Sequence, residues 1–336
     1  MLNLKQTLIF LLKKIHSFFK NFFQNNSNGQ TKTLNPKNLH SESSTMSEAV
    51  GSSTANSRKP SLPNISTMFT PAHLETLGIQ FENTQDIEQF FDLKLELYDF
   101  DESLMILNLI RHDLRTLDER PELLNELTDN EKTIGLLLNK VIAHDPLKVS
   151  IRESFTSNFL NYLLIKLGFA QYPLLMYSQP KYSLEFEGLK MTGKPEFSIE
   201  NRSQIKCIFV DENRHLTNIK IATEFSECQI AAELTAAAYT SYASPASSSM
   251  LKDQTVFAVR VIGTRFTFYK AIFHKIYLES ISSGNLDLAQ RHELNVYRYP
   301  PNDETETLFG FDYSDNKHRE IVLKLLIRLR EQIKSV

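Results

Sequence analysis

Several residue types and motifs are scarce or missing in this chain, and each absence excludes a class of protein. Only two cysteines, Cys207 and Cys228, occur in 336 residues, which excludes a disulfide scaffold and a four-cysteine zinc site. So few cysteines suit the reducing interior of a cell. The sequence has no Gly-x-x-x-x-Gly-Lys-Ser/Thr loop, no Gly-x-Gly-x-x-Gly loop and no Gly-x-Ser-x-Gly turn. It therefore lacks the motifs of an ATPase, a dinucleotide-dependent oxidoreductase or an α/β-hydrolase.

Acidic residues are absent before Glu42, and the first part of this acid-free stretch is apolar. Residues 1–24 contain the run Leu8 to Leu12, followed by lysines and two Phe-Phe pairs. The run is too short to span a bilayer. Three interpretations stay open: an amphipathic helix on a membrane surface, an organelle presequence, or a signal-peptide-like segment. We favour a peripheral anchor or targeting helix, in an intracellular protein of the nucleus or cytoplasm, with the mitochondrion as the alternative compartment.

Composition and charge divide the rest of the chain into three parts. Residues 25–67 are rich in Ser, Thr and Asn and carry three prolines, which predicts a disordered linker. Residues 68–150 show helical apolar periodicity, and their net charge from Phe69 onward is −10, so we expect an acidic helical block. Residues 151–336 have a net charge of +1 and are expected to form the functional domain. Such a neutral domain lacks the general basic footprint of a nucleic-acid binder, although a local groove could still be basic.

The functional domain is predicted to be α/β, with a mixed sheet of about five strands flanked by helices. The expected elements are a helix at 153–168, strands at 184–187, 197–199 and 207–210, a helix from 226 to 243, a hairpin of 254–262 and 265–273, and a closing helix at 316–334. The run Cys207 to Val210 is apolar on both faces, which is typical of a central strand. Four basic residues of or just after the hairpin are interpreted as a solvated face, with a phosphate path as the alternative: Arg260, Arg265, Lys270 and Lys275.

Polar residues stand at the ends of two of these strands. Glu196 directly precedes the strand at 197–199, and Glu212 and Arg214 follow the strand at 207–210. Because side chains alternate along a strand, Glu212 and Arg214 should project to one face. Two carboxylates beside a cation suit a hard divalent metal such as Mg²⁺ or Mn²⁺, which can activate water and neutralise charge on a phosphoryl group. Taken singly, Glu196 is equally explained as an edge carboxylate, and Glu212 to Arg214 as a polar turn.

This arrangement resembles the PD-(D/E)XK nuclease superfamily. Pro195-Glu196 stands where the family has Pro-Asp, Glu212-Asn213-Arg214 where it has acidic-x-Lys, and Gln229 at the glutamine position of the following helix. Glu153 matches an additional acidic residue on the leading helix, although an acid favoured by the helix dipole explains it equally well. Gln229 could reach the site or pair with Glu233 one turn later. The chain departs from the family pattern by Glu for Asp and by Arg for Lys.

The resemblance implies a restriction-endonuclease-like α/β/α core between about Arg152 and Phe273, and a metal-dependent nuclease that hydrolyses phosphodiester bonds of DNA or RNA. Glu196 and Glu212 would hold Mg²⁺ or Mn²⁺, Glu153 would assist, Arg214 would stabilise charge, and Gln229 would orient a water or a phosphate. The alternative is a nuclease-like fold without turnover that binds nucleic acid or protein. The two departures from the family pattern and the neutral charge favour this alternative.

Overall fold

The computed structural model describes residues 63–92, 101–106, 109–143, 153–186, 189–211, 219–244, 253–301 and 310–335. All of them belong to one compact unit that starts at Ser57. The expected anchor at residues 1–24, together with Glu212 and Arg214, lies outside the described residues. No helix within the described ranges is long and apolar enough to cross a membrane.

An eight-stranded mixed sheet forms the centre of the fold, which confirms the predicted α/β class and exceeds the expected five strands. In spatial order its strands are β1 (Ile79–Asn83), β9 (Leu294–Tyr299), β8 (Arg265–Phe273), β7 (Gln254–Ile262), β6 (Gln204–Asp211), β5 (Phe197–Asn201) and β2 (Leu174–Ser178), and β10 (Phe311–Asp312) pairs with β8. The pairs β1–β9 and β6–β7 are parallel, and the other pairs are antiparallel.

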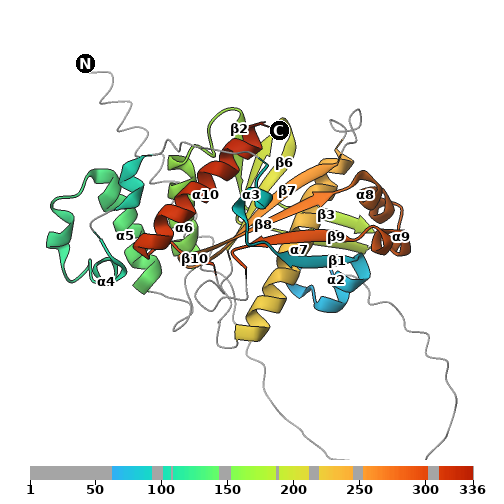
Figure 1. Ribbon diagram of the computed structural model, residues 1–336, viewed down its shortest axis with the longest axis horizontal. Coiled ribbons are helices and arrows are strands. Elements are labelled where there is room, and N and C mark those ends of the chain that lie inside the picture. Colours follow the sequence, from blue (N-terminus) through green and yellow to red (C-terminus); the bar gives the residue numbers. More distant parts are fainter. Residues whose placement is uncertain are drawn as a thin grey trace, which may run out of the picture. The chain divides into compact units, whose positions relative to one another are not determined.

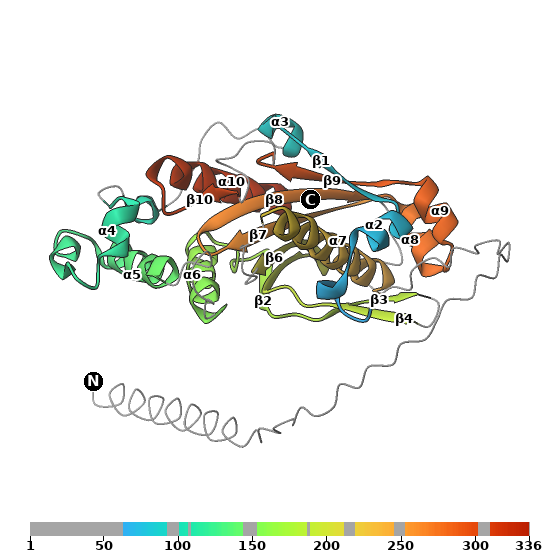
Figure 2. The same ribbon diagram turned by 90° about the horizontal axis from the view of Figure 1, so that it is seen from below.

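Helices cover both faces of this sheet. The described helices are α2 (Pro71–Leu77), α3 (Ile87–Phe90), α4 (Arg111–Arg115), α5 (Asp129–Ala143), α6 (Glu153–Lys166), α7 (Ile219–Ala243), α8 (Lys275–Ser282), α9 (Leu286–Arg291) and α10 (Asn316–Ser335), with short 3-10 helices η1 (Ser66–Met68), η2 (Glu102–Met105) and η3 (Pro121–Leu124). One hydrophobic core joins a sheet face to α5, α6 and α10, and a second joins the other face to α2, α7, α8 and α9. Figure 1 and Figure 2 show the sheet between α10 and α7.

Strand β6 has the central position that its apolar sequence predicts. Cys207 and Phe209 belong to the core on the α10 side, whereas Ile208 and Val210 belong to the core on the α7 side. All four side chains are buried. The alternation therefore identifies which face each neighbouring residue occupies, including the residues of β5 and β2.

The prediction that residues 184–187 form the first strand of the sheet is wrong. Those residues overlap β3 (Tyr182–Phe186), which pairs with β4 (Leu189–Gly193) in a separate two-stranded sheet. The strand beside β5 is β2, with the sequence Leu-Leu-Met-Tyr-Ser. Pro173 and Pro180 flank β2 closely, and prolines so near each other are typical of a loop, which hides the strand in the sequence.

One helix prediction also needs correction: the helix expected to start near Ser226 begins at Ile219. Within the expected helical block, Ile106 adopts a left-handed backbone conformation with φ of 44° between η2 and α4. By contrast, α6, α10 and the β7–β8 hairpin lie within two residues of their predicted bounds.

Two of the four basic residues interpreted as solvated are buried. Arg260 has 1% of its surface exposed and Lys270 has 4%. The Arg260 guanidinium donates to Thr267 Oγ1 over 3.2 Å, and Lys270 Nζ lies 3.0 Å from the Asp92 carboxylate. The interpretation fails because both faces of the sheet are covered, and Arg260 projects to the α7 face while Lys270 projects to the α10 face. Arg260 and Lys270 therefore do not line one phosphate path.

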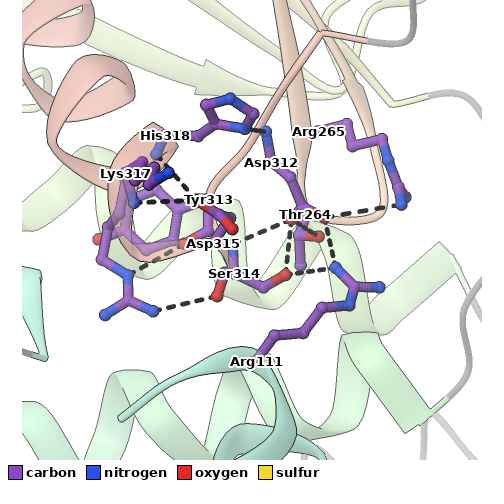
Figure 3. A network of polar contacts seen from close by, with 10 residues as sticks. Arg111, Thr264, Arg265, Asp312, Tyr313, Ser314, Asp315, Lys317 and His318 are labelled. Carbon is purple, nitrogen blue, oxygen red and sulfur yellow. Dashed lines mark hydrogen bonds and ion pairs between the residues drawn. The ribbon is translucent and has the colours of Figure 1, made fainter. Parts of the chain in front are cut away.

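A polar network joins the helical block to the C-terminal helix (Figure 3). The Asp312 carboxylate accepts hydrogen bonds from Thr264 and Ser314 and pairs with Arg111 and Arg265. Burial by itself raises the pKa of Asp312, but these two arginines and two hydroxyls lower it overall. Arg111 comes from α4, Arg265 from the start of β8, and Ser314 from the segment before α10. The network thus connects three parts of the fold, and we regard it as structural.

Arg319 of α10 has the same structural role at a neighbouring position. Its guanidinium is fully buried and donates to five backbone carbonyls, those of Met105, Ile106, Leu109, Tyr313 and Ser314. Burial lowers the pKa of Arg319. A single cation thus satisfies the irregular backbone between η2 and α4, which explains why an arginine is buried in the core.

Candidate functional site

Glu196 lies at the start of β5, between β2 and the end of β6. Its backbone N–H donates to Phe209 O over 2.8 Å, and its carbonyl accepts from the Gln179 N–H over 2.7 Å. The register of β5 and β6 pairs Phe197 with Phe209, and the Glu196 N–H bonds the carbonyl of that same Phe209. The regular ladder therefore ends at Phe197, and Glu196 lies in the irregular segment that leads from β4 into β5.

The carboxylate of Glu196, unlike its backbone, has no bonding partner within the part of the chain that the structure describes. It is half-buried, and it forms no hydrogen bond or ion pair with the residues that the structure describes. A carboxylate without such partners, on a strand held by hydrogen bonds at both sides, can accept a ligand without breaking protein contacts. This is the property expected of a metal ligand or of a residue that contacts substrate.

Helix α7 approaches the segment before Glu196 very closely. A Cβ atom built on Gly193 would lie 3.1 Å from Glu233 Cγ and 3.4 Å from Glu233 Cα. Five alanines of α7 are buried in the core on this side of the sheet and keep the helix slender: Ala231, Ala232, Ala236, Ala237 and Ala238. Small residues on both partners thus fix the distance between α7 and the turn that leads into β5.

Glu233 is the most unusual titratable group at this contact. Its side chain is 1% exposed, and its Oε1 accepts hydrogen bonds from Ser66 Oγ over 2.9 Å and from Gln229 Nε2 over 3.1 Å. Burial raises the pKa of Glu233 to about 7, while the donors Ser66, Gln229 and the Lys194 backbone lower it by less. Glu233 is therefore an acid whose charge changes near neutral pH.

Ser66 reaches Glu233 from a segment that runs along the β3–β4 hairpin. Thr192 N–H donates to Asn64 O over 2.9 Å, and Ile65 forms a parallel bridge with Thr192. Ser66 itself is buried. Residues 63–67, the end of the range interpreted as a linker, thus contact α7 and β4 beside the candidate site.

The predicted site residues can now be located. Glu196 directly precedes β5, as described above, and Gln229 is on α7, where its amide donates to Glu233. Glu153 is the first residue of α6, and the placement of its side chain lies outside the description. Glu212 and Arg214 also lie outside it, although β6 ends at Asp211, one residue before Glu212. The sequence interpretation gave no role in a site to Glu233 or Ser66. In the structure Glu233 accepts a hydrogen bond from Gln229, and Ser66 donates to Glu233.

A signal for Glu233 was present in the sequence. A glutamate embedded among alanines on a buried helix is rarely found without a partner, and Gln229 precedes it by one turn. Ser66 had no such signal, because its contact spans 167 positions in the chain.

The described part of the site supplies one half of a magnesium centre. Mg²⁺ is usually bound by one or two carboxylates, several waters and a substrate phosphate, and Glu196 provides one carboxylate without a partner among the described residues. No group of three metal-binding side chains occurs among the residues with described positions. Glu233 is nearly fully buried, and its Oε1 accepts from two protein donors.

Comparison with known proteins adds no family to this geometry. No protein-family model matches the chain, and no curated protein is significantly similar to it.

Proposed function

We propose that this chain is a metal-dependent nuclease that hydrolyses phosphodiester bonds of nucleic acid. The observation that carries the proposal is Glu196: a half-buried carboxylate that has no partner among the described residues and whose backbone is bonded to Phe209 near the end of β6. The order of elements around it supports the same proposal. Helix α6 precedes the antiparallel strands β2, β5 and β6, and α7 then leads to β7, parallel to β6.

Glu196 and Glu212 would hold the metal ion, with Glu153 assisting from α6. When bound, Mg²⁺ would activate a water and neutralise charge on the phosphoryl group. Glu212 follows β6 directly in the sequence, and an even-numbered residue continues the side of Val210 if the strand alternation is kept. The charge of the two glutamates is what attracts the ion to this edge of the sheet.

Arg214 would stabilise negative charge on the phosphate as it is attacked. It cannot accept the proton of the attacking water, because the pKa of a guanidinium is far above neutral. Gln229 is held by Glu233 and is therefore positioned by a residue whose charge depends on pH. Its carbonyl oxygen would orient a water or the substrate from the α7 side.

A second function has a specific observation in its favour. The Gln229 amide is engaged by Glu233 rather than directed to a free site, and Arg stands where the nuclease family has Lys. Both features suit a nuclease-like fold that binds nucleic acid or protein without turnover.

Cleavage assays with matched variants test the proposal. The purified full chain is incubated with labelled single- and double-stranded DNA and RNA in Mg²⁺, Mn²⁺ or chelator. Arg214→Lys should retain or raise metal-dependent cleavage, whereas Arg214→Ala should lower it by about 10²- to 10³-fold, the effect of removing one stabiliser of developing charge. Glu196→Gln and Glu212→Gln should lower both rate and Mn²⁺ affinity.

Glu196→Gln is the sharpest of these variants. The Glu196 carboxylate has no protein partner in the described structure, so its replacement should leave the unfolding free energy nearly unchanged while cleavage is lost. Absence of cleavage by the parent protein with every substrate and metal would reject the nuclease and favour the binding module. Cleavage that survives Glu196→Gln would place the reaction elsewhere.

A further inference from the structure

The edge strand β2 carries an exposed apolar surface beside the candidate site. Three large side chains at or before β2 are strongly exposed: Tyr172 at 95%, Leu175 at 55% and Tyr177 at 43%. Leu175 and Tyr177 belong to the strand itself, and we call these two residues the β2 stripe. An edge strand of this kind is usually protected by charges or covered by another element, but β2 contains no charged residue.

The β2 stripe projects to the α7 side of the sheet. Leu174 is in the core on the α10 side, so the alternate residues Leu175 and Tyr177 project to the α7 side. Tyr177 pairs with Ser198 in the register of β2 and β5, and Ser198 follows Glu196 by two residues. The stripe therefore runs along β2 from the end of the sheet at which the candidate carboxylate lies.

Basic residues accompany the stripe at both ends. Lys181 and Lys194 are near the Tyr177 end, since Lys181 follows β2 and Lys194 precedes Glu196 by two residues. Arg202 is at the other end, in the turn after Asn201, which pairs with Leu174. These three side chains are exposed, and none of them forms an ion pair within the described parts of the chain.

Glu200 is the opposing charge on this surface. It pairs with Leu175 in the register of β2 and β5, and burial raises its pKa. Three cations without an ion pair among the described residues, set against Glu200 and Glu196, leave the described part of this surface positive, and a metal ion bound at Glu196 would make it more so. The charge of this surface complements a polyanion.

We propose that the β2 stripe binds single-stranded nucleic acid and leads it to Glu196. A base would stack on the ring of Tyr177, while phosphates would contact Lys181, Lys194 and Arg202. Stacking requires the open face of a base, which a duplex does not offer. Only the role of Glu196 in this proposal rests on the proposed nuclease function. Binding of the single strand to the β2 stripe does not depend on any reaction.

A second copy of the chain is the competing occupant of an unprotected edge strand. Pairing of two β2 strands would bring the same three cations of each copy to one interface, where they repel. Pro173 and Pro180 also limit the ladder to a few residues on either side. The charge of the surface therefore favours nucleic acid over self-association.

Binding is measured by fluorescence anisotropy with labelled single-stranded and double-stranded oligonucleotides, using the full chain in chelator so that cleavage cannot interfere. The parent should prefer single strands. Tyr177→Ala should weaken binding by about 5- to 150-fold, the range for one lost stacking contact, whereas Tyr177→Phe should retain it. Lys194→Gln should lower the dependence of log K on log salt by about one phosphate contact. Ile110→Ala, an exposed apolar residue on the helical block, is the matched control and should change nothing.

The outcomes separate this inference from the nuclease proposal. Single-strand binding that depends on the Tyr177 ring supports the inference, even if the parent cleaves no substrate. Cleavage by a parent whose binding is unaffected by Tyr177→Ala overturns the inference and leaves the nuclease intact. No binding, or an equal preference for duplex, overturns it as well. A dimer in sedimentation that Leu175→Lys dissociates, without nucleic-acid binding, would assign the stripe to a second copy.

Discussion

Glu233 should make the stability of the folded chain fall as the pH rises toward neutral. The folded protein holds this carboxyl with a pKa of about 7, against 4.5 as the ordinary value. Below about pH 4.5 both the folded and the unfolded chain keep the proton, and the group has no effect on stability. Between the two pKa values only the folded chain keeps it, so raising the pH favours the unfolded chain.

The size of the effect follows from the shift. One pKa unit corresponds to about 1.4 kcal/mol, so the shift of Glu233 amounts to about 3 kcal/mol in total, of which about 2 kcal/mol falls between pH 5 and pH 7. Above about pH 7.5 both states are ionised and the loss levels off. This carboxyl is almost completely buried, so solvent screening reduces the effect little.

Urea unfolding of the parent and of Glu233→Gln between about pH 5 and about pH 8 measures this pH dependence of the unfolding free energy. The glutamine keeps an oxygen that can accept from Ser66 and Gln229 but cannot titrate. Other groups titrate equally in both proteins, so the difference between the two pH slopes isolates Glu233. Ser66→Ala provides a second check, because the hydroxyl lowers the pKa of Glu233 and its removal should extend the decline to higher pH. Parallel pH profiles for parent and Glu233→Gln would refute the reasoning.

Two further predictions concern packing. Gly193→Ala should destabilise the fold by about 1–3 kcal/mol, because its Cβ would press on the Glu233 backbone and side chain. Gly135→Ala should be neutral or stabilising in α5, because its Cβ would meet only leucine methyls at 3.6 Å or more. Urea unfolding midpoints compare the two variants. Arg319→Lys should cost about 2–4 kcal/mol of unfolding free energy, since an ammonium cannot bond five carbonyls in a planar fork, and a thermal midpoint equal to that of the parent would contradict this.

Local patterns predicted the parts of the fold that depend on neighbouring residues. The β7–β8 hairpin was predicted with its observed bounds, because two long apolar runs flank Gly263, which adopts a φ of 60° in the turn. Strand β6 was predicted as central because its residues are apolar on both faces. In each of these elements the sequence pattern and the tertiary environment require the same residues.

Elements at the edge of the fold were not predicted, for a physical reason. Strand β2 exposes Leu175 and Tyr177 to solvent, so its apolar pattern does not report a buried face. The β3–β4 hairpin has regular strand propensity, but nothing local determines whether it joins the main sheet or pairs alone. The break at Ile106 depends on Arg319, more than two hundred residues away, which stabilises carbonyls that a continuous helix would have satisfied itself.

The candidate site shows the same division. Glu196 was recognisable from its place before a strand, whereas its state in the fold results from three contacts that no local pattern contains. Its backbone is bonded to Phe209 on one side and to Gln179 on the other, and Gly193 lets α7 close over the turn that precedes it. These contacts hold the backbone of Glu196 and leave its carboxylate without a described partner. A carboxylate whose main chain is fixed and whose oxygens have no partner among the described residues can bind a cation or a substrate without first breaking a protein contact, which is why its replacement by glutamine should remove ligand binding and leave stability unchanged.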